Sequence, residues 1–253
     1  MEVIYTYQFF TYFYIGLSIP RILGSNQSEV GFTPLHGAAW NGHISILQLL
    51  ISRGANTDPL GPLKLTPLLV AAQGGKLTCV KFLLDNGANI HAKDTEELSI
   101  LHKASESDNE ELVHLLLSKG VSVNDKDQFG YTAAHIAAYY GNVKVLKLLI
   151  SKGANPLERD FQYGTLLHHA SKGDHYKLLK YLLKHHSIDV NSKDKNEDTP
   201  LHIASLVGSR NCTKVLLSKG ADPLLGNSDN LTPLHKAAYG GSVRYITIYI
   251  FLG

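Results

Sequence analysis

Thirteen histidines and two cysteines are the residues of this 253-residue chain best suited to acid–base, metal-binding or nucleophilic chemistry. A zinc site or a proton-transfer site needs histidines clustered with carboxylates, as in a His-x3-His pair with an acidic partner. The chain contains no such pair, and the adjacent His185 and His186 lie near an expected helix end, where histidines are usually solvated. We therefore expect no metal site.

Cys79 and Cys212 each follow a threonine by 13 residues, counted from Thr66 and Thr199. A catalytic thiol needs a neighbour that stabilises its thiolate, and the sequence shows none beside either cysteine. We predict that both are small buried core residues. Phosphate loops, nucleophile elbows and kinase signatures are also missing from the sequence. These patterns predict a protein that is not an enzyme, with no cofactor and no small-molecule substrate.

Six of the histidines end a tetrapeptide that recurs along the chain. The tetrapeptides start near residues 33, 66, 99, 132, 165, 199 and 232, so the step is 33 residues with a single step of 34. A fixed period of this length indicates a repeat architecture. We interpret the six imidazoles as bridges between the capping threonine and nearby backbone, which tie one repeat to the next. They are His36, His102, His135, His168, His202 and His235.

Each recurring feature has a structural explanation. Thr followed by Pro, as in Thr33-Pro34, starts a helix because the hydroxyl caps a backbone N–H and proline fits the first helical position. A pair of small residues then allows two helices to approach closely. An apolar triplet predicts the buried face of a second helix, and a glycine 21 residues after most of the threonines predicts its left-handed cap.

The motif Thr-Pro-Leu-His-x-Ala-Ala, the glycine at the inter-helix turn and the Gly-Ala-Asn/Asp after the second helix resemble the ankyrin repeat, and the resemblance covers residues 31–253. It implies an all-α solenoid in which paired antiparallel helices alternate with β-turn fingers in a gently curved stack. Repeats three and five depart from the pattern, with Asp108 and Asp174 at the usual inter-helix glycine. Repeat five also gains one residue in 184–191 and loses its capping glycine. We expect local irregularity there.

Composition narrows the class of function. Apolar residues make up 44% and charged residues 18% of the chain, as in soluble globular proteins, and a net charge of +2 does not predict nucleic-acid binding. Two cysteines do not form a disulfide scaffold, so a reducing, cytoplasmic location is expected.

The two ends do not look like the polar caps that a repeat stack needs. Residues 1–30 begin with an apolar, aromatic stretch at 3–20 that has no charge and no basic residue before it. It could be a membrane anchor, a degenerate cap, or the edge of a fragment or a mistaken chain start. Residues 243–253 turn β-branched and aromatic, which suggests either a cut or altered chain or an exposed partner site.

The resemblance places partner binding on the inner helices and the fingers. The residue seven positions after each Thr or Ser should face the concave side, and the next column adds Asn41 and Tyr140. Tyrosine and tryptophan, which both occur among these residues, are frequent interface anchors. The ladder is Trp40, Gln73, Glu106, Tyr139, Lys172, Leu206 and Tyr239, and the expected exposed finger aromatics are Phe129, Phe161 and Tyr163.

Charge is uneven along the chain. Residues 94–111 are rich in acids, whereas Lys177, Lys180 and Lys184 share one helix face by their spacing. Such a run is usually a solvated surface, and a partner of complementary charge is the alternative.

We expect a protein-interaction scaffold or adaptor that binds another protein, of unknown identity, through the concave and finger surface. The alternative is the repeat region of a larger signalling enzyme, such as a kinase, or of a membrane channel. A third hypothesis is association with a membrane through residues 3–20.

Overall fold

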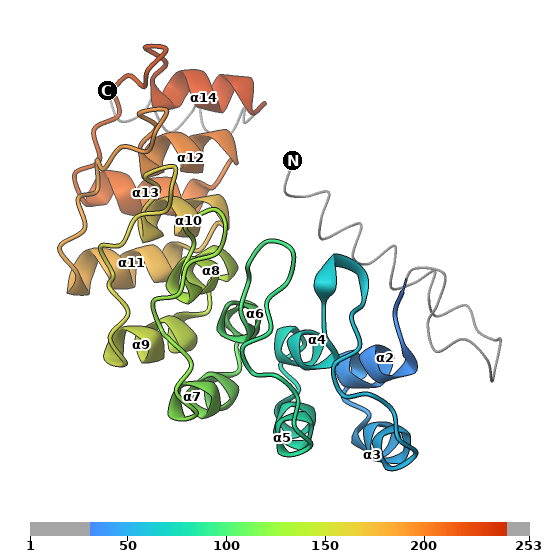
Figure 1. Cartoon of the computed structure of the whole chain (residues 1–253). Coiled ribbons are helices and arrows are strands. Elements are labelled where there is room, and N and C mark those ends of the chain that lie inside the picture. Colours follow the sequence, from blue (N-terminus) through green and yellow to red (C-terminus); the bar gives the residue numbers. More distant parts are fainter. Residues whose placement is uncertain (1–30, 242–253) are drawn as a thin grey trace. The chain divides into compact units, whose positions relative to one another are not determined.

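The computed structural model describes residues 31–241, which form thirteen α-helices and no strand (Figure 1). In that range the only β pairing is an isolated antiparallel bridge between Lys93 and Ser99. No helix there is long and apolar enough to cross a membrane. The predicted all-α repeat fold is confirmed. Two segments about which the sequence raised questions lie outside the described residues. They are residues 3–20 and residues 243–253, the latter with the glycine at 253.

Each of the first six repeats forms an inner helix followed by an outer helix, and the described part of the seventh forms an inner helix. The inner helices are α2 (Pro34–Asn41), α4 (Pro67–Gln73), α6 (Ile100–Glu106), α8 (Ala133–Tyr140), α10 (Leu166–Lys172), α12 (Pro200–Leu206) and α14 (Pro233–Tyr239). The outer helices are α3 (Ile44–Ser52), α5 (Leu77–Asp85), α7 (Glu110–Ser118), α9 (Val143–Ser151), α11 (Tyr176–His185) and α13 (Arg210–Ser218). A 3-10 turn, η1 (Pro62–Lys64), lies in the first finger.

The chain forms two compact units that divide between Ala104 and Ser105, within α6. In unit 1, α2 packs on α4 and α3 packs on α5. In unit 2, α8, α10, α12 and α14 form a row of inner helices, while α7 packs on α9 and α11 packs on α13 (Figure 1). Short helices of this kind cannot bury their apolar faces alone, so each repeat depends on its neighbours for stability.

The inner helices begin after the predicted Thr or Ser residues, and most outer helices end before the predicted glycines. Thr66 accepts a hydrogen bond from the backbone N–H of Leu69 at 3.2 Å, which is the expected cap. Gly54 ends α3 with φ of 85°, a left-handed conformation that a side chain would disfavour. The equivalent glycines also have positive φ; they are Gly87, Gly120, Gly153 and Gly220.

The small residues are buried as the sequence predicted, but the apolar triplets are less buried than predicted. Ala71, Ala72 and Ala137 have no exposed surface, so the small residues do allow the close helix approach. The apolar triplets are only partly buried, because consecutive residues lie about 100° apart around a helix. In the triplet Leu148-Leu149-Ile150 of α9 only the central Leu149 is fully buried, and in the triplet of α3 Leu49 is 54% exposed.

Repeat five is irregular, as expected. Its outer helix α11 has ten residues, whereas α9 and α13 have nine. Instead of a left-handed glycine, His186 follows α11 in an extended conformation with φ of −134°. Asp174 adopts the left-handed conformation, with φ of 62°, that glycine adopts in other repeats.

Gly173→Ala should destabilise the protein by about 2 kcal/mol, in the range expected for an overpacked site. A Cβ at Gly173 would overlap the carbonyl oxygen of Tyr139, which belongs to the neighbouring inner helix. Gly37→Ala is the matched control, because a Cβ there meets nothing within 4 Å. Gly37→Ala removes a glycine from helix α2, so this control should stabilise the protein by about 0.5–1 kcal/mol. Urea unfolding would measure both, and equal effects of the two variants would contradict the close packing of α8 on α10.

Candidate functional site

The repeated histidines form a framework that joins adjacent repeats. In unit 1, Nδ1 of His36 accepts the backbone N–H of Thr33 at 3.1 Å, and Nε2 donates to the carbonyl oxygen of Leu65 at 3.0 Å. In unit 2, Nε2 of His168 donates to the backbone carbonyl oxygen of Asp198 at 3.0 Å. An Nδ1 that accepts an N–H carries no proton, so each ring is the neutral Nε2–H tautomer. The interpretation of these histidines as bridges between repeats is confirmed for His36, His168 and His202.

His135 differs from these histidines. Its Nδ1 accepts the N–H of Thr132 at 3.1 Å, but its buried Nε2 has no hydrogen-bond partner. The ring packs edge to face against His169, with centroids 5.1 Å apart. Burial and, to a smaller extent, the neighbouring His169 together lower the pKa of His135 to about 3. The side chain is therefore a neutral core residue.

His169 is paired with an acid that the sequence reasoning missed. Its Nε2 lies 2.8 Å from Oδ2 of Asp160, and both side chains are buried. Burial by itself would raise the pKa of Asp160, but the hydrogen bonds from His169 and from backbone N–H groups hold this pKa below its usual value. No group of three or more His, Cys, Asp or Glu that could hold a metal occurs within residues 31–241.

Both cysteines are buried free thiols, as predicted. Burial raises the pKa of Cys212 to about 12, and the nearby Asp174 carboxylate acts in the same direction. Burial also raises the pKa of Cys79. A thiol that stays protonated at neutral pH is a poor nucleophile, so neither residue is suited to covalent chemistry.

Acidic residues at the base of the fingers position the finger tips. Oδ1 of Asp160 accepts the backbone N–H groups of Gln162 and Gly164, each at 2.8 Å. The same pair of bonds recurs at Asp94, Asp127, Asp194 and Asn227. These five residues stand five positions before each Thr or Ser. Their recurrence in phase was a signal in the sequence that could have identified them.

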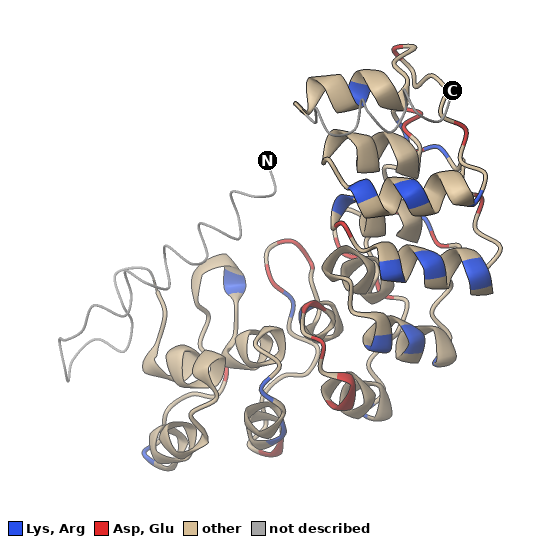
Figure 2. Ribbon diagram, turned by 180° about the vertical axis from the view of Figure 1, so that it is seen from behind, with Lys and Arg blue, Asp and Glu red and all other residues tan. Residues whose placement is uncertain are grey.

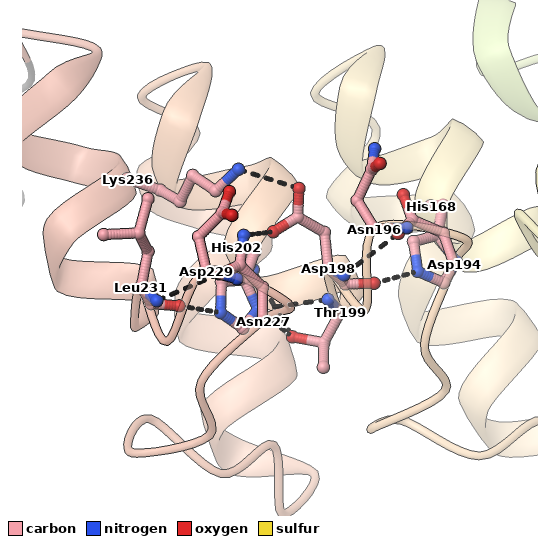
Figure 3. A network of polar contacts seen from close by, with 10 residues as sticks. All are labelled: His168, Asp194, Asn196, Asp198, Thr199, His202, Asn227, Asp229, Leu231 and Lys236. Carbon is pink, nitrogen blue, oxygen red and sulfur yellow. Dashed lines mark hydrogen bonds and ion pairs between the residues drawn. The ribbon is translucent and has the colours of Figure 1, made fainter.

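The fingers of repeats six and seven are joined by a polar network (Figure 3). Asp198, buried at the end of its finger, accepts Nδ2 of Asn227 at 2.9 Å and Nζ of Lys236 at 2.8 Å. Its backbone carbonyl accepts Nε2 of His168. One residue therefore connects inner helices α10 and α14 to two fingers, which fixes the fingers relative to the helices in unit 2.

The predicted finger aromatics are exposed. Phe129, Phe161 and Tyr163 have 44%, 57% and 58% of their surface accessible. The backbone N–H of Phe161 donates to the carbonyl oxygen of Phe129 at 3.0 Å, so the two tips are adjacent. Nζ of Lys126 lies 5.6 Å from the Phe161 ring centroid, which is a cation–π distance.

Three of the predicted ladder residues are in contact with Tyr140 of the next column or with one another, and we name the four the inner row: Glu106, Tyr140, Tyr139 and Lys172. The hydroxyl of Tyr140 donates to Oε2 of Glu106 at 3.2 Å. The rings of Tyr139 and Tyr140 meet edge to face, with centroids 5.3 Å apart. Nζ of Lys172 lies 5.9 Å from the Tyr139 ring centroid. Burial, and then the Glu106 carboxylate, raise the pKa of Tyr140, which keeps it a hydrogen-bond donor.

The remaining candidates are more dispersed. Leu206 is half-buried at the end of α12 and Tyr239 is 89% exposed at the end of α14. Val207, which the sequence reasoning did not include, is 46% exposed beside Leu206. In unit 1, Trp40 and Gln73 are half-buried and Asn41 is exposed.

The comparisons with known proteins agree with this geometry. A family model that consists of three ankyrin repeats matches five overlapping segments between residues 18 and 250. The crystal structure of the human ASB11 ankyrin repeat domain is similar, with a TM-score of 0.70 and 26% identity. That similarity covers 81% of this chain and 92% of the ASB11 chain.

Curated relatives match over shorter segments. Transient receptor potential cation channel subfamily A member 1 from Homo sapiens is 36% identical over 72 residues, which cover 28% of this chain and 6% of the channel. Delta-latroinsectotoxin-Lt1a from Latrodectus tredecimguttatus is 54% identical over 41 residues, which cover 16% of this chain and 3% of the toxin. The matches thus span a small part of these relatives. The family model, which covers most of the sequence, shows that the chain belongs to the ankyrin repeat family, whose repeats generally serve as protein-interaction modules.

Proposed function

We propose that this chain is a protein-interaction scaffold or adaptor that binds its partner through the inner row and the finger aromatics of unit 2. The observation that carries the proposal is the contact between Tyr139, Tyr140 and their charged neighbours on α6 and α10. Aromatic side chains held in place by their neighbours lose little entropy on binding, which makes them effective anchors. The buried thiols and the buried, neutral rings of His135 and His168 support a function without intrinsic catalysis.

The backbone of the finger at Tyr163 supports the same proposal. Tyr163 has φ of 61°, a conformation that a bulky residue adopts at a cost. At the equivalent position the preceding finger has Gly130, with φ of 82°. Nη1 of Arg159 donates to the Tyr163 carbonyl at 2.7 Å. An exposed tyrosine kept at a strained position fits a role in contacting a partner.

Tyr139→Ala combined with Tyr140→Ala should weaken partner binding at least 10-fold, because interface tyrosines commonly contribute more than 1 kcal/mol each. The thermal melting temperature should change little, since both side chains are partly exposed. Binding of the purified variants to a captured partner, by calorimetry, gives the measurement. A separate Trp40→Ala variant tests whether unit 1 contributes.

The matched control is Tyr176→Ala combined with Tyr181→Ala, which removes two tyrosine rings from outer helix α11. This control should leave the affinity for the protein partner unchanged. Unchanged affinity in the Tyr139 and Tyr140 variant, with a normal melting temperature, would overturn the assignment of the inner row.

A second proposal is that the repeats belong to a larger signalling enzyme or membrane channel. The match to a cation channel, over 6% of that channel, favours it. Intact mass of the native polypeptide is the test, because a mass of 27.8 kDa would contradict it. For either version we propose a cytoplasmic location, supported by the two free cysteines.

A further inference from the structure

Three of the four outer helices of unit 2 carry only cations among their charged side chains; the fourth, α7, carries Glu110 and Glu111 and packs on α9. Helices α9, α11 and α13 contain no aspartate or glutamate (Figure 2). We name their exposed cations the outer basic face: Lys144, Lys147, Lys177, Lys180, Lys184, Arg210 and Lys214. None of the seven forms an ion pair with a residue in the range 31–241.

The three helices form one continuous surface. Helix α11 packs on α13, and Nζ of Lys147 on α9 lies 4.9 Å from the ring centroid of Tyr181 on α11. Neighbouring helices pack about 8–10 Å apart, and residues three or four apart on a helix are about 5–6 Å apart. The charges are therefore spread in two dimensions over three helices rather than along a single line.

The net charge of the whole chain hides this surface. The sum of +2 reflects acids located elsewhere, such as Glu110 and Glu111 in the first turn of α7. Asp174, in the turn before α11, is the nearest acid in sequence, and its Oδ1 is bonded to the hydroxyl of Ser209. Seven like charges without an ion pair to an acid of the described residues repel one another, and a polyanion would relieve that repulsion.

The residue types indicate which polyanion fits. Six of the seven cations are lysines, which act as hydrated point charges, whereas arginine predominates where carboxylates or phosphates are recognised in a fixed geometry. The large exposed apolar side chains between residues 143 and 219 are Leu157, Phe161, Tyr163 and Val207, and all lie outside the three outer helices. The face thus lacks the apolar anchors of a peptide-binding groove. A two-dimensional array of lysines matches a plane of negative charge.

We propose that the outer basic face binds the surface of a membrane that contains anionic lipid. Each lysine near such a surface contributes about 1 kcal/mol of attraction, and several together give reversible, salt-sensitive binding without a membrane-spanning helix. The outer helices and the inner row are opposite members of the helix pairs in unit 2, so a membrane and a protein partner can be bound together. The chain then recruits its partner to an anionic membrane.

Sedimentation of the purified full chain with lipid vesicles tests the proposal. The chain should bind vesicles of phosphatidylcholine with 30% phosphatidylserine much more tightly than vesicles of phosphatidylcholine alone. Raising the salt from 50 mM to 500 mM should release it. The triple variant K177E/K180E/K184E should bind the anionic vesicles about 100-fold more weakly, from three lost contacts. Its circular dichroism melt should match that of the unmodified chain.

The matched control is K64E/K119E/K195E, which changes the net charge equally at exposed lysines outside the three helices. Its vesicle binding should fall by less than 5-fold. Equal loss in both triple variants would overturn the proposal in favour of a general charge effect. Equal binding to neutral vesicles would overturn it in favour of residues 3–20. Tighter binding to a 20-base-pair DNA duplex than to anionic vesicles would overturn it in favour of nucleic acid.

Discussion

Lowering the pH from 7 to 5 is expected to reduce the free energy of unfolding by about 4 kcal/mol, mainly through two buried histidines. Burial lowers the pKa of His135 to about 3 and that of His168 to about 4. In the unfolded chain both should titrate near pH 6.5. Between these values the unfolded state binds protons that the folded state does not, so stability falls as the pH falls.

The sign and size of the change in unfolding free energy follow from the difference in histidine pKa between the folded and unfolded states. Well above pH 6.5 both rings are neutral in either state, and they contribute no pH dependence. From pH 6.5 to 5 each contributes about 1.4 kcal/mol per pH unit, or about 2 kcal/mol. The structure explains why the folded rings resist protonation: Nδ1 of His135 faces the N–H of Thr132, and Nδ1 of His168 faces the N–H of Thr165. A proton on Nδ1 would replace each of these hydrogen bonds with a repulsive contact.

Urea unfolding at pH 5, 6 and 7 checks this prediction. The double variant H135Q/H168Q should be less stable at pH 7, because it loses packing and hydrogen bonds. Its loss of stability between pH 7 and 5 should be smaller than that of the unmodified chain by about 4 kcal/mol. An equally steep profile in the double variant would show that other groups control the acid sensitivity.

Asp198→Ala is expected to destabilise unit 2 by about 3 kcal/mol, which is typical of breaking a buried ion pair by removing one partner. The carboxylate accepts both Lys236 and Asn227 (Figure 3), and the Lys236 side chain is only 18% exposed. Without Asp198, an ammonium and an amide would lose their partners in a largely dry environment. Asp198→Asn should cost less, because its amide oxygen can still accept the hydrogen bond from Asn227.

A double variant separates the pair from other effects of the substitution. D198A/K236M removes both charges, so it should be more stable than D198A alone. Asp229→Ala, at an exposed position of the neighbouring finger, is the control and should change stability by less than about 0.5 kcal/mol. The prediction fails if D198A unfolds at the same urea concentration as D229A.

The repeat framework could be predicted from the sequence because each element depends on local residues in fixed phase. Thr66 before Pro67 and Gly54 after α3 specify helix ends through capping bonds and backbone conformation alone. The bridging role of His36 was predictable for the same reason, since one repeat supplies the ring and the next repeat supplies the acceptor. These inferences required no knowledge of how distant repeats pack.

The site was harder to predict because it depends on single residues that do not recur. Asp160 is one of a column of finger acids, but its bond to His169 exists only because repeat five has a histidine at that position. The pairing of Tyr140 with Glu106 joins residues 34 positions apart on different inner helices. The sequence predicted Glu106 in the concave ladder and Tyr140 in the column beside it, yet the hydrogen bond between them required the structure.

The outer basic face could also be predicted only in part from the sequence. The spacing of Lys177, Lys180 and Lys184 predicted one basic helix face. Only the packing of α11 with α13, and the contact of Lys147 with Tyr181, extends this face over three helices. The net charge of +2 had given no indication of nucleic-acid binding. A total charge carries no information about where the charges gather.

Photocrosslinking from single positions tests the central claim, that unit 2 binds a protein through its inner row and fingers. A photoreactive phenylalanine would replace Tyr139, Tyr163 or, as the control, Tyr181 on outer helix α11. The claim predicts that positions 139 and 163 crosslink the same protein in extracts of the source cells and that position 181 does not. Crosslinks from position 181 alone, or equal crosslinks from all three positions, would contradict it.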